Sequence, residues 1–399
     1  MKSFLGVRYL AFASSAAAWH TAPPVSPSSV WNIKHTTNNS AKFGTRTRSS
    51  SKQQGSRQCV GTTVGVQAAH TSGVEGARRE TGGVKVIYDD FFLKHRPPRG
   101  HDHPECPERV STAKAELENL EGLAWATPSS LSSEDGKAAT VGAIERVHKK
   151  EYLDEIRGIC KKGGGGADFD TYVCPDTFEV CIAATSAWMD AAESALEGSP
   201  AFALTRPPGH HATSGVAMGF CIVCFAAVSA FHALETLGCR RVAMLDFDVH
   251  HGNGIAALVK GDDRIRYCSI HQGGIFPGSG GAEDAGPLGT LKHLPFFGLG
   301  ETWDTYEARF EEALTWLHEF DPDLLIVSAG YDALDADELA TASLKPEDYG
   351  RMGKRLEQVF GRKVAFGLEG GYNLQVTPKA IRETLEPFLL NAPAAVAPV

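Results

Sequence analysis

The chain has 399 residues, a net charge of −9 and a hydrophobic fraction of 42%, which is enough apolar material for a sizeable globular core. It has no stretch of about 18 apolar residues, so the sequence predicts no membrane-spanning helix. Beyond residue 74 the chain holds 31 basic and 48 acidic residues. This excess of acidic residues argues against direct nucleic-acid binding and is compatible with basic substrates.

The first 74 residues differ from the rest in composition. They carry eight Lys or Arg and no acid, and they are rich in Ser, Thr and Ala, as organellar transit peptides are. The first 18 also resemble a weak secretory signal ending in small residues, and the two together would suit a plastid address. We therefore predict that residues 1–80 are a disordered targeting leader for a plastid or mitochondrion. The alternative is an untargeted disordered tail on a nuclear or cytoplasmic protein.

From residue 84 onward, short apolar runs alternate with amphipathic helical patterns. The predicted strands are 84–88, 201–205, 241–247, 264–270, 323–329 and 363–369, and the predicted helices are 107–120, 141–160, 176–197, 219–237, 302–320, 346–360 and 375–390. Strands that are apolar throughout are buried on both faces, and this alternation is typical of a parallel sheet. We predict one α/β domain over residues 84–390, with a mainly parallel sheet flanked by helices on both faces, and a tail over 391–399.

The nine cysteines are scattered and odd in number, which does not indicate a disulfide framework. One CxxC pair, Cys221 and Cys224, lies inside the apolar run GFCIVCFAAV. We expect buried small side chains there rather than a redox or zinc site, because those need accessible sulfur.

Residues that can carry chemistry follow five of the predicted strands. These stretches are RPPGHH after 201–205, DVHHGNG after 241–247, HQ and then FPG after 264–270, GYD after 323–329 and GGY after 363–369. In parallel sheets ligands bind beyond the carboxyl ends of the strands. The sequence therefore predicts one site at that edge of the sheet.

Asp248 and His250 are two positions apart in an extended segment, so their side chains point to the same side. Asp332 can supply a third ligand from another strand end. Two carboxylates and an imidazole leave coordination positions open, as in catalytic rather than structural zinc sites. The alternative for Asp332 is an ordinary helix or turn cap.

His210 and His211 follow a Pro-Pro-Gly turn. Beside a metal site such a pair can act as general base and acid, although alone it would more often be a pair of loop histidines. The carboxylate of Asp246 and the amide of Asn253 are available to hold the two imidazoles. A carboxylate raises the pKa of its partner more than an amide does, so the two histidines can differ in protonation.

Tyr372 follows two glycines, and its phenol could donate a hydrogen bond to an oxyanion beside a metal. Phe220, after Gly219, and Phe276, before Pro277, could form apolar walls of a substrate site. For the two phenylalanines the alternative is simple core packing.

The ordered motifs RPPGHHA, GFC, DFDVHHGNG, SxHQ…FPG, SAGYDA and LEGGYN together resemble the zinc-dependent histone deacetylase family over about residues 84–390. HPECPER, LEGGYN and Asn253 are similar to class II members and to bacterial acetylpolyamine amidohydrolases. With its leader, the chain looks most like plant plastid-type deacetylases. The resemblance implies an arginase-like α/β fold with zinc at the base of a narrow tunnel.

The resemblance also implies roles for individual residues. By position they are zinc ligands Asp248, His250 and Asp332; general base and acid His211, with Asn253; second histidine His210, with Asp246; oxyanion-stabilising Tyr372; and tunnel residues Gly219, Phe220, Phe276 and Leu339. A structural potassium ion is implied as well, held by Asp246, Asp248, His250 and Ser269, partly through backbone carbonyls. Ala336-Asp337-Glu338 departs from the family's usual Gly-Asp-Pro at the tunnel rim near Leu339, so the resemblance does not carry the family's substrate preference over to this chain.

Three functions stay open at this point. The first is hydrolysis of acetyl-lysine in histones or other proteins, and the second is hydrolysis of small acetylated amines such as acetylpolyamines. The third is a catalytically silent scaffold, because a fold alone does not guarantee activity. The sequence does not fix the oligomeric state.

Overall fold

The computed structural model describes residues 83–390. The predicted leader over 1–80 and the tail over 391–399 lie outside these residues. Within them no helix is long and apolar enough to cross a membrane.

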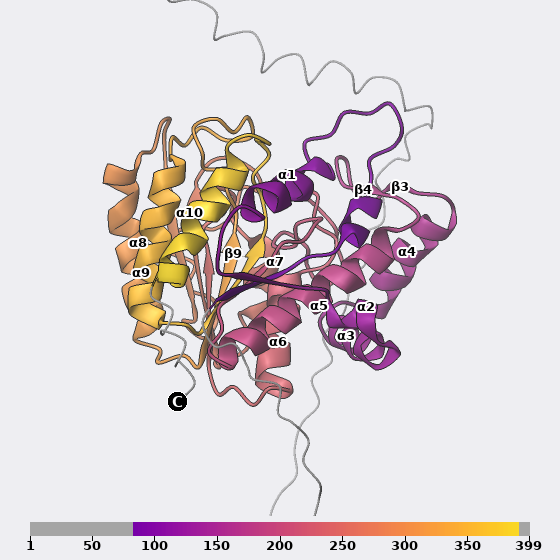
Figure 1. Ribbon diagram of the computed structural model, residues 1–399, viewed down its shortest axis with the longest axis horizontal. Coiled ribbons are helices and arrows are strands. Elements are labelled where there is room, and N and C mark those ends of the chain that lie inside the picture. Colours follow the sequence, from indigo (N-terminus) through magenta and orange to yellow (C-terminus); the bar gives the residue numbers. More distant parts are fainter. Residues whose placement is uncertain (1–82, 391–399) are drawn as a thin grey trace, which may run out of the picture. The chain divides into compact units, whose positions relative to one another are not determined.

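A parallel sheet forms the middle layer (Figure 1). Its strands are β1 (Val84–Ile87), β2 (Leu123–Ala126), β5 (Ala201–Ala203), β6 (Val242–Asp246), β7 (Ile265–Gln272), β8 (Leu291–Phe296), β9 (Leu324–Ala329) and β10 (Val364–Leu368). They run in the order β2-β1-β5-β10-β9-β6-β7-β8, and every neighbouring pair is parallel. The predicted fold class is confirmed.

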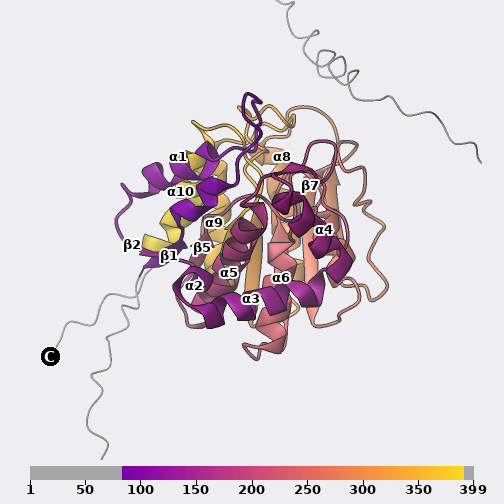
Figure 2. The ribbon, with the colours of Figure 1, turned by 90° about the vertical axis from the view of Figure 1, so that its right-hand side faces the viewer.

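Helices cover both faces of this sheet. The longest, α5 (Thr177–Leu196), packs on β1, β5 and β10, and α6 (Phe225–Glu235) packs beside it on β6 and β9. These two lie in front of the sheet in Figure 2, with α2 (Ser129–Ser132), α3 (Glu134–Val147) and α4 (Lys150–Lys161) around them. The opposite face carries α8 (Trp303–His318), α9 (Pro346–Phe360) and α10 (Thr377–Leu390), and α1 (Glu108–Leu117) packs on α10.

The central strands β6, β9 and β10 are buried at every position, as their continuous apolar runs predicted. Edge strand β2 has no fully buried residue, and edge strand β8 alternates and contains Pro295. β2 is apolar but only four residues long, and β8 mixes apolar residues with Lys292, His293 and Pro295, and the sequence analysis missed both. It also missed the 3-10 helix η3 (Asp90–Lys94), helices α2 and α7 (Asn253–Val259), and the two-residue strands β3 (Gly165–Gly166) and β4 (Tyr172–Val173).

The prediction of one continuous helix over 141–160 is wrong. Two helices cover this stretch, because α3 ends at Val147 and α4 begins at Lys150. His148 is extended there, and its Nε2 accepts a hydrogen bond from the backbone N–H of Cys224 at 3.0 Å. The N–H of Lys149 donates to the carbonyl of Ser214 at 2.7 Å. Both bonds tie the break to the segment that precedes α6.

The helix predicted over 219–237 begins six residues late, at Phe225. Gly219 and Phe220 adopt left-handed backbone angles, with φ of 55° and 68°, and such residues cannot continue a helix. A non-glycine residue in this region costs energy and often marks a functional position. Here the conformation turns the Phe220 ring toward Tyr372, at 5.6 Å between ring centroids.

Candidate active site

Five neighbouring strands of the sheet deliver the predicted site residues. β5, β10, β9, β6 and β7 are consecutive in the sheet order, and each is followed by one of the motifs. Because all are parallel, their carboxyl ends meet at one edge. Segments 160 residues apart in sequence, such as those that carry Gly209 and Glu369, therefore converge.

Asp248, His250 and Asp332 form a group whose ligand atoms all lie within 4.8 Å of one another. The Nδ1 of His250 lies 3.2 Å from Asp248 Oδ1 and 3.0 Å from Asp332 Oδ2. Both carboxylates are fully buried, while the His250 side chain keeps 13% exposure. The group is thus closed toward the core and open on the His250 side.

The charges of this group fit a divalent metal ion. Burial, followed by the charge of Asp248, raises the pKa of Asp332 to about 7. Burial alone would lower the pKa of His250, but its hydrogen bonds to the two carboxylates raise it to about 10. Without a metal ion, a proton on His250 compensates the charge of the two carboxylates. A divalent cation bound among the three side chains would take over this role. Two carboxylates and an imidazole are the donor set of an open zinc site.

His210 is held by carboxylates, as the pairing with Asp246 implied. Its Nδ1 lies 3.2 Å from Asp246 Oδ2, which also accepts from the hydroxyl of Tyr267 at 2.8 Å. Burial opposes the charged imidazole, but Asp248 and Asp246 outweigh burial and raise the pKa of His210 well above its ordinary value. The two carboxylates therefore favour the charged form of His210.

His211 has the opposite electrostatic environment. Its Nδ1 donates to Asn253 Oδ1 at 2.8 Å, which leaves Nε2 without a proton. Burial, followed by the charges of His210 and His250, lowers the pKa of His211 well below its ordinary value. The two imidazoles, 3.9 Å apart between centroids, therefore differ in protonation, and His211 is the one able to accept a proton.

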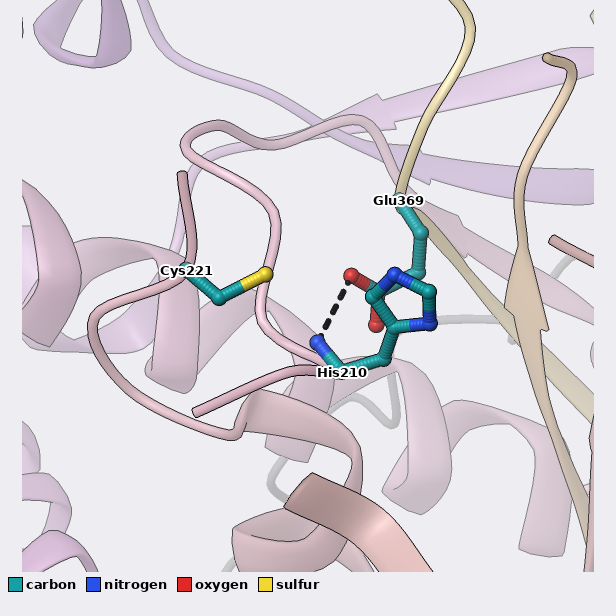
Figure 3. A group of neighbouring side chains, drawn as sticks. All are labelled: His210, Cys221 and Glu369. Atoms are coloured by element: carbon teal, nitrogen blue, oxygen red, sulfur yellow. Dashed lines mark hydrogen bonds between the residues drawn. The ribbon is translucent and has the colours of Figure 1, made fainter. Parts of the chain in front are cut away.

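Glu369 is a buried residue that the sequence analysis did not single out. Its Oε2 accepts from the backbone N–H of Gly209 at 2.6 Å and from that of His210 at 3.1 Å, and Figure 3 shows the second of these bonds. Its Oε1 accepts from the hydroxyl of Ser328 at 3.2 Å. This carboxylate therefore fixes the turn that carries both histidines.

His210, Cys221 and Glu369 form a second group with ligand-type atoms close together (Figure 3). Burial, followed by the charge of Glu369, raises the pKa of the Cys221 thiol well above its ordinary value, so the sulfur stays protonated and is a poor ligand. His210 is engaged by Asp246, and Glu369 by the backbone. We assign this group to holding the histidine turn. Cys221 and Cys224 are both buried, free thiols, as expected for the CxxC pair.

Tyr372 is positioned by two residues from distant segments. Its N–H donates to Asp337 Oδ2 at 2.7 Å, and the guanidinium of Arg109 lies 4.6 Å from its ring centroid. Arg109 also donates from Nε to the carbonyl of Gly371 at 2.8 Å. Burial raises the pKa of the Tyr372 phenol well above 10, although Arg109 opposes this shift, so the phenol is a hydrogen-bond donor.

The predicted wall residues surround the open side of the metal group. The Phe276 ring lies 5.0 Å from that of His211 and 6.3 Å from that of His250. A Cβ on Gly219 would lie 2.6 Å from His211 and 2.8 Å from Phe276, so only glycine fits between them. Leu339 is half-buried and donates its N–H to Asp337 Oδ1 at 3.0 Å, which places it beside the Tyr372 loop.

A family model described as "Histone deacetylase domain" matches residues 103–387. The chain belongs to the histone deacetylase family. An uncharacterized protein of Synechocystis is 41% identical over 77% of this chain and 99% of its own length. "Histone deacetylase 14, chloroplastic" of Arabidopsis thaliana is 35% identical over 73% of this chain and 74% of its own. The crystal structure of the HDA15 HD domain superposes with a TM-score of 0.70 at 29% identity, over 77% of this chain and 91% of that one.

Family membership and the arrangement of the site agree on the type of chemistry. A deacetylase or amidohydrolase cleaves an amide with water, and it needs a base, an oxyanion donor and a place for an electrophile. The site contains groups of these three kinds: a histidine with a lowered pKa, a protonated phenol and a group of metal-type donors. This deacetylase-family chain is therefore a hydrolase of acetylated amines.

Proposed function

We propose that this protein hydrolyses N-acetyl-lysine amides in proteins, releasing acetate and free lysine, with a zinc ion held by Asp248, His250 and Asp332. One observation carries the proposal. His211, neutral and with Nε2 free, lies beside a buried donor group that fits a divalent cation. A scaffold without activity would not need two adjacent histidines with opposite protonation.

Zinc bound there would polarise the acetyl carbonyl and acidify a water molecule. His211 takes the proton of the attacking water on Nε2 and then returns it to the leaving lysine amine, so it ends the cycle neutral. Tyr372 donates its hydroxyl hydrogen bond to the oxyanion of the tetrahedral intermediate. His210 lies between Asp246 and Asp248, and Asp246 orients its imidazole beside His211.

Two further assignments belong to this proposal. A potassium ion bound through Asp246, Asp248, His250 and Ser269 would compensate the remaining buried charge, and Asp246 and Ser269 are register partners in β6 and β7.

We also propose residues 84–390 as the catalytic domain and a plastid location directed by residues 1–80. The chloroplastic designation of the Arabidopsis relative supports this location. A reporter fused to residues 1–80 should enter plastids; a reporter that stays diffuse in the cytosol or enters the nucleus would contradict it.

The decisive experiment compares wild type with Tyr372→Phe on an acetyl-lysine peptide and on acetylspermidine. Acetate release from the peptide should require zinc, and the variant should lose roughly 10²–10³-fold in kcat, as when one oxyanion donor is removed. Turnover of acetylspermidine without turnover of the peptide would favour the small-amine alternative. A zinc-loaded wild type inactive on both would support the silent scaffold.

A further inference from the structure

The three most exposed large apolar side chains of the described residues all lie on loops beside the site. Phe169 is 89% exposed, Leu299 85% and Phe297 73%, whereas the other exposed large hydrophobic side chains range from 38% to 54%. Single exposed apolar residues are common on any protein, but clustering around a functional site indicates a contact surface. We call Phe169, Phe297 and Leu299 the apolar rim.

Phe169 lies in the turn between β3 and β4, which are labelled at the upper right of Figure 1. The hydroxyl of Thr171, two residues later, accepts from the N–H of Phe220 at 3.0 Å. The carbonyl of Asp170 lies 3.1 Å from Nε2 of His103, whose ring contacts that of Phe220 at 4.8 Å. The turn that carries Phe169, one end of the apolar rim, is therefore hydrogen-bonded to the segment of Phe220, one of the predicted wall residues.

Phe297 and Leu299 belong to the loop after β8. The Phe297 ring packs so closely on Gly273 that a Cβ there would lie 2.3 Å from it. Gly273 begins the short loop that leads to Phe276. The other end of the apolar rim thus adjoins the Phe276 wall.

The loop of Phe297 and Leu299 is also bonded to the segment after Leu339. Gln272 Nε2 donates to Thr341 Oγ1 at 2.7 Å and to the carbonyl of Gly298 at 3.3 Å. The N–H of Gly300 donates to the carbonyl of Thr341 at 2.7 Å. The two side chains are thus exposed on a hydrogen-bonded loop rather than on a fraying end.

We propose that the apolar rim binds apolar side chains that flank the acetyl-lysine of a protein segment, so that the enzyme selects acetyl-lysines with apolar neighbours on both sides. This inference rests on the proposed function. Free acetyl-lysine or an acetylpolyamine offers no apolar groups beyond its alkyl chain, and it would leave the rim in water. A polypeptide that inserts its acetyl-lysine between Phe220 and Phe276 carries its neighbouring side chains toward both ends of the rim. Aromatic and leucine side chains then gain from mutual burial.

The test measures two peptides that differ only in the residues flanking acetyl-lysine, Phe and Leu in one and Ser in the other. N-acetyl-lysine methylamide is the substrate without neighbours. Kinetics are determined for the zinc-loaded wild type and for Phe169→Ser, Phe297→Ser and Leu299→Ser, and equilibrium peptide binding for the same proteins with the additional change Tyr372→Phe, which slows turnover of the peptide. Leu131→Ser, an exposed apolar position on α2, is the matched control.

The wild type should prefer the apolar peptide by about ten-fold in KM and in Kd, with kcat similar for both. Each rim variant should reduce this preference several-fold and change the methylamide reaction little, and Leu131→Ser should change neither. Equal KM for the two peptides, or variants as selective as wild type, would overturn the inference. So would a rim that governs binding to lipid vesicles instead of peptides.

The binding measurement separates this inference from the proposed function. If the wild type binds the apolar peptide selectively but hydrolyses none of the substrates, the proposed function alone fails. If it hydrolyses both peptides without preference, the inference alone fails. If it neither binds nor hydrolyses the peptides, both fail.

Discussion

Glu369 connects the two halves of the proposed catalytic apparatus. Its side chain accepts the amides of Gly209 and His210, and its backbone carbonyl accepts from Arg109, whose guanidinium stacks on Tyr372. The histidine turn and the tyrosine loop therefore share one anchor. A shift of this anchor would move the proton acceptor and the oxyanion donor relative to each other.

This anchoring predicts a difference between two substitutions. Glu369→Ala removes the acceptor for both amides and should lower kcat by roughly 10–100-fold with a smaller change in KM, because misplaced catalytic groups slow the chemical step. Glu369→Gln keeps a carbonyl oxygen facing the amides and should retain most activity. Peptide kinetics, with circular dichroism and zinc content as controls, would check this. A Gln variant as impaired as the Ala variant would show that the negative charge matters instead.

At the scale of single residues, the sequence reveals groups that follow strand ends, and the structure brings these together. Asp248, His250 and Asp332 are close in space because β6 and β9 are neighbours; the alternating pattern predicts a shared edge of the sheet but not this strand order. Glu369 and Asp337 were not identified, because they act by accepting backbone amides from loops remote in sequence. No local pattern records such a partner, although Glu369 ends a predicted strand.

At the scale of elements, the contact between β10 and α5 requires a glycine at position 367, where any side chain would collide with α5. A Cβ on Gly367 would lie 2.0 Å from the indole of Trp188, which is buried between helix and sheet. Gly367→Ala should therefore destabilise the fold by about 1–3 kcal/mol or more, since the packed core cannot absorb the methyl group. Chemical denaturation would measure the loss.

The matched control is another glycine-to-alanine change. Gly158 lies inside α4, and a Cβ there meets nothing within 4 Å. Gly158→Ala should stabilise the protein by about 0.5–1 kcal/mol, because alanine favours a helix. If both variants lost stability equally, the close contact of Gly367 with Trp188 would not be the cause.

Element boundaries were predictable where one periodic pattern dominates, as for α5, α8 and α9. They were not predictable where a distant contact decides. The break at His148 depends on the N–H of Cys224, and the delayed start of α6 depends on the backbone of Phe220. Both residues fit a helical pattern locally. The interactions that prevent a helix at these positions are tertiary contacts with distant segments.

At the scale of the whole molecule, buried neutral histidines make stability depend on pH. Burial lowers the pKa of His148 to about 4, and burial with the charge of Arg206 lowers that of His95 to about 3, against about 6.5 when unfolded. As pH falls below about 6.5, the unfolded chain binds protons that the native one does not. These two histidines therefore make stability fall progressively down to about pH 4, by roughly 1.4 kcal/mol per pH unit each, whereas the buried carboxyls of Glu369 and Asp332, whose pKa is raised to about 7, act in the opposite direction.

His148→Gln should remove one of these contributions, because glutamine can still accept from the N–H of Cys224 but does not titrate. Urea unfolding at pH 7, 6 and 5 should show a slope shallower than that of wild type by about one proton. An unchanged slope would mean that His148 is protonated in the native state.

Removal of metal should affect activity and stability together. Asp248 and Asp332 are buried side by side, and a cation that binds only the folded state stabilises it by mass action. Chelation should abolish acetate release and lower Tm, and both should recover as zinc is added. A chelated protein that retains activity would contradict the proposed zinc site.

The position of β10 in the sheet has a consequence for synthesis. β10 is the last strand of the chain to be made, yet it lies between β5 and β9 and is the strand that joins them. Until residue 368 has left the ribosome, the nascent chain holds two unjoined half-sheets with open parallel edges, which are prone to pair with other chains. Any product truncated before β10 would lack Tyr372 and would leave these edges exposed, so such chains should be inactive and aggregation-prone together.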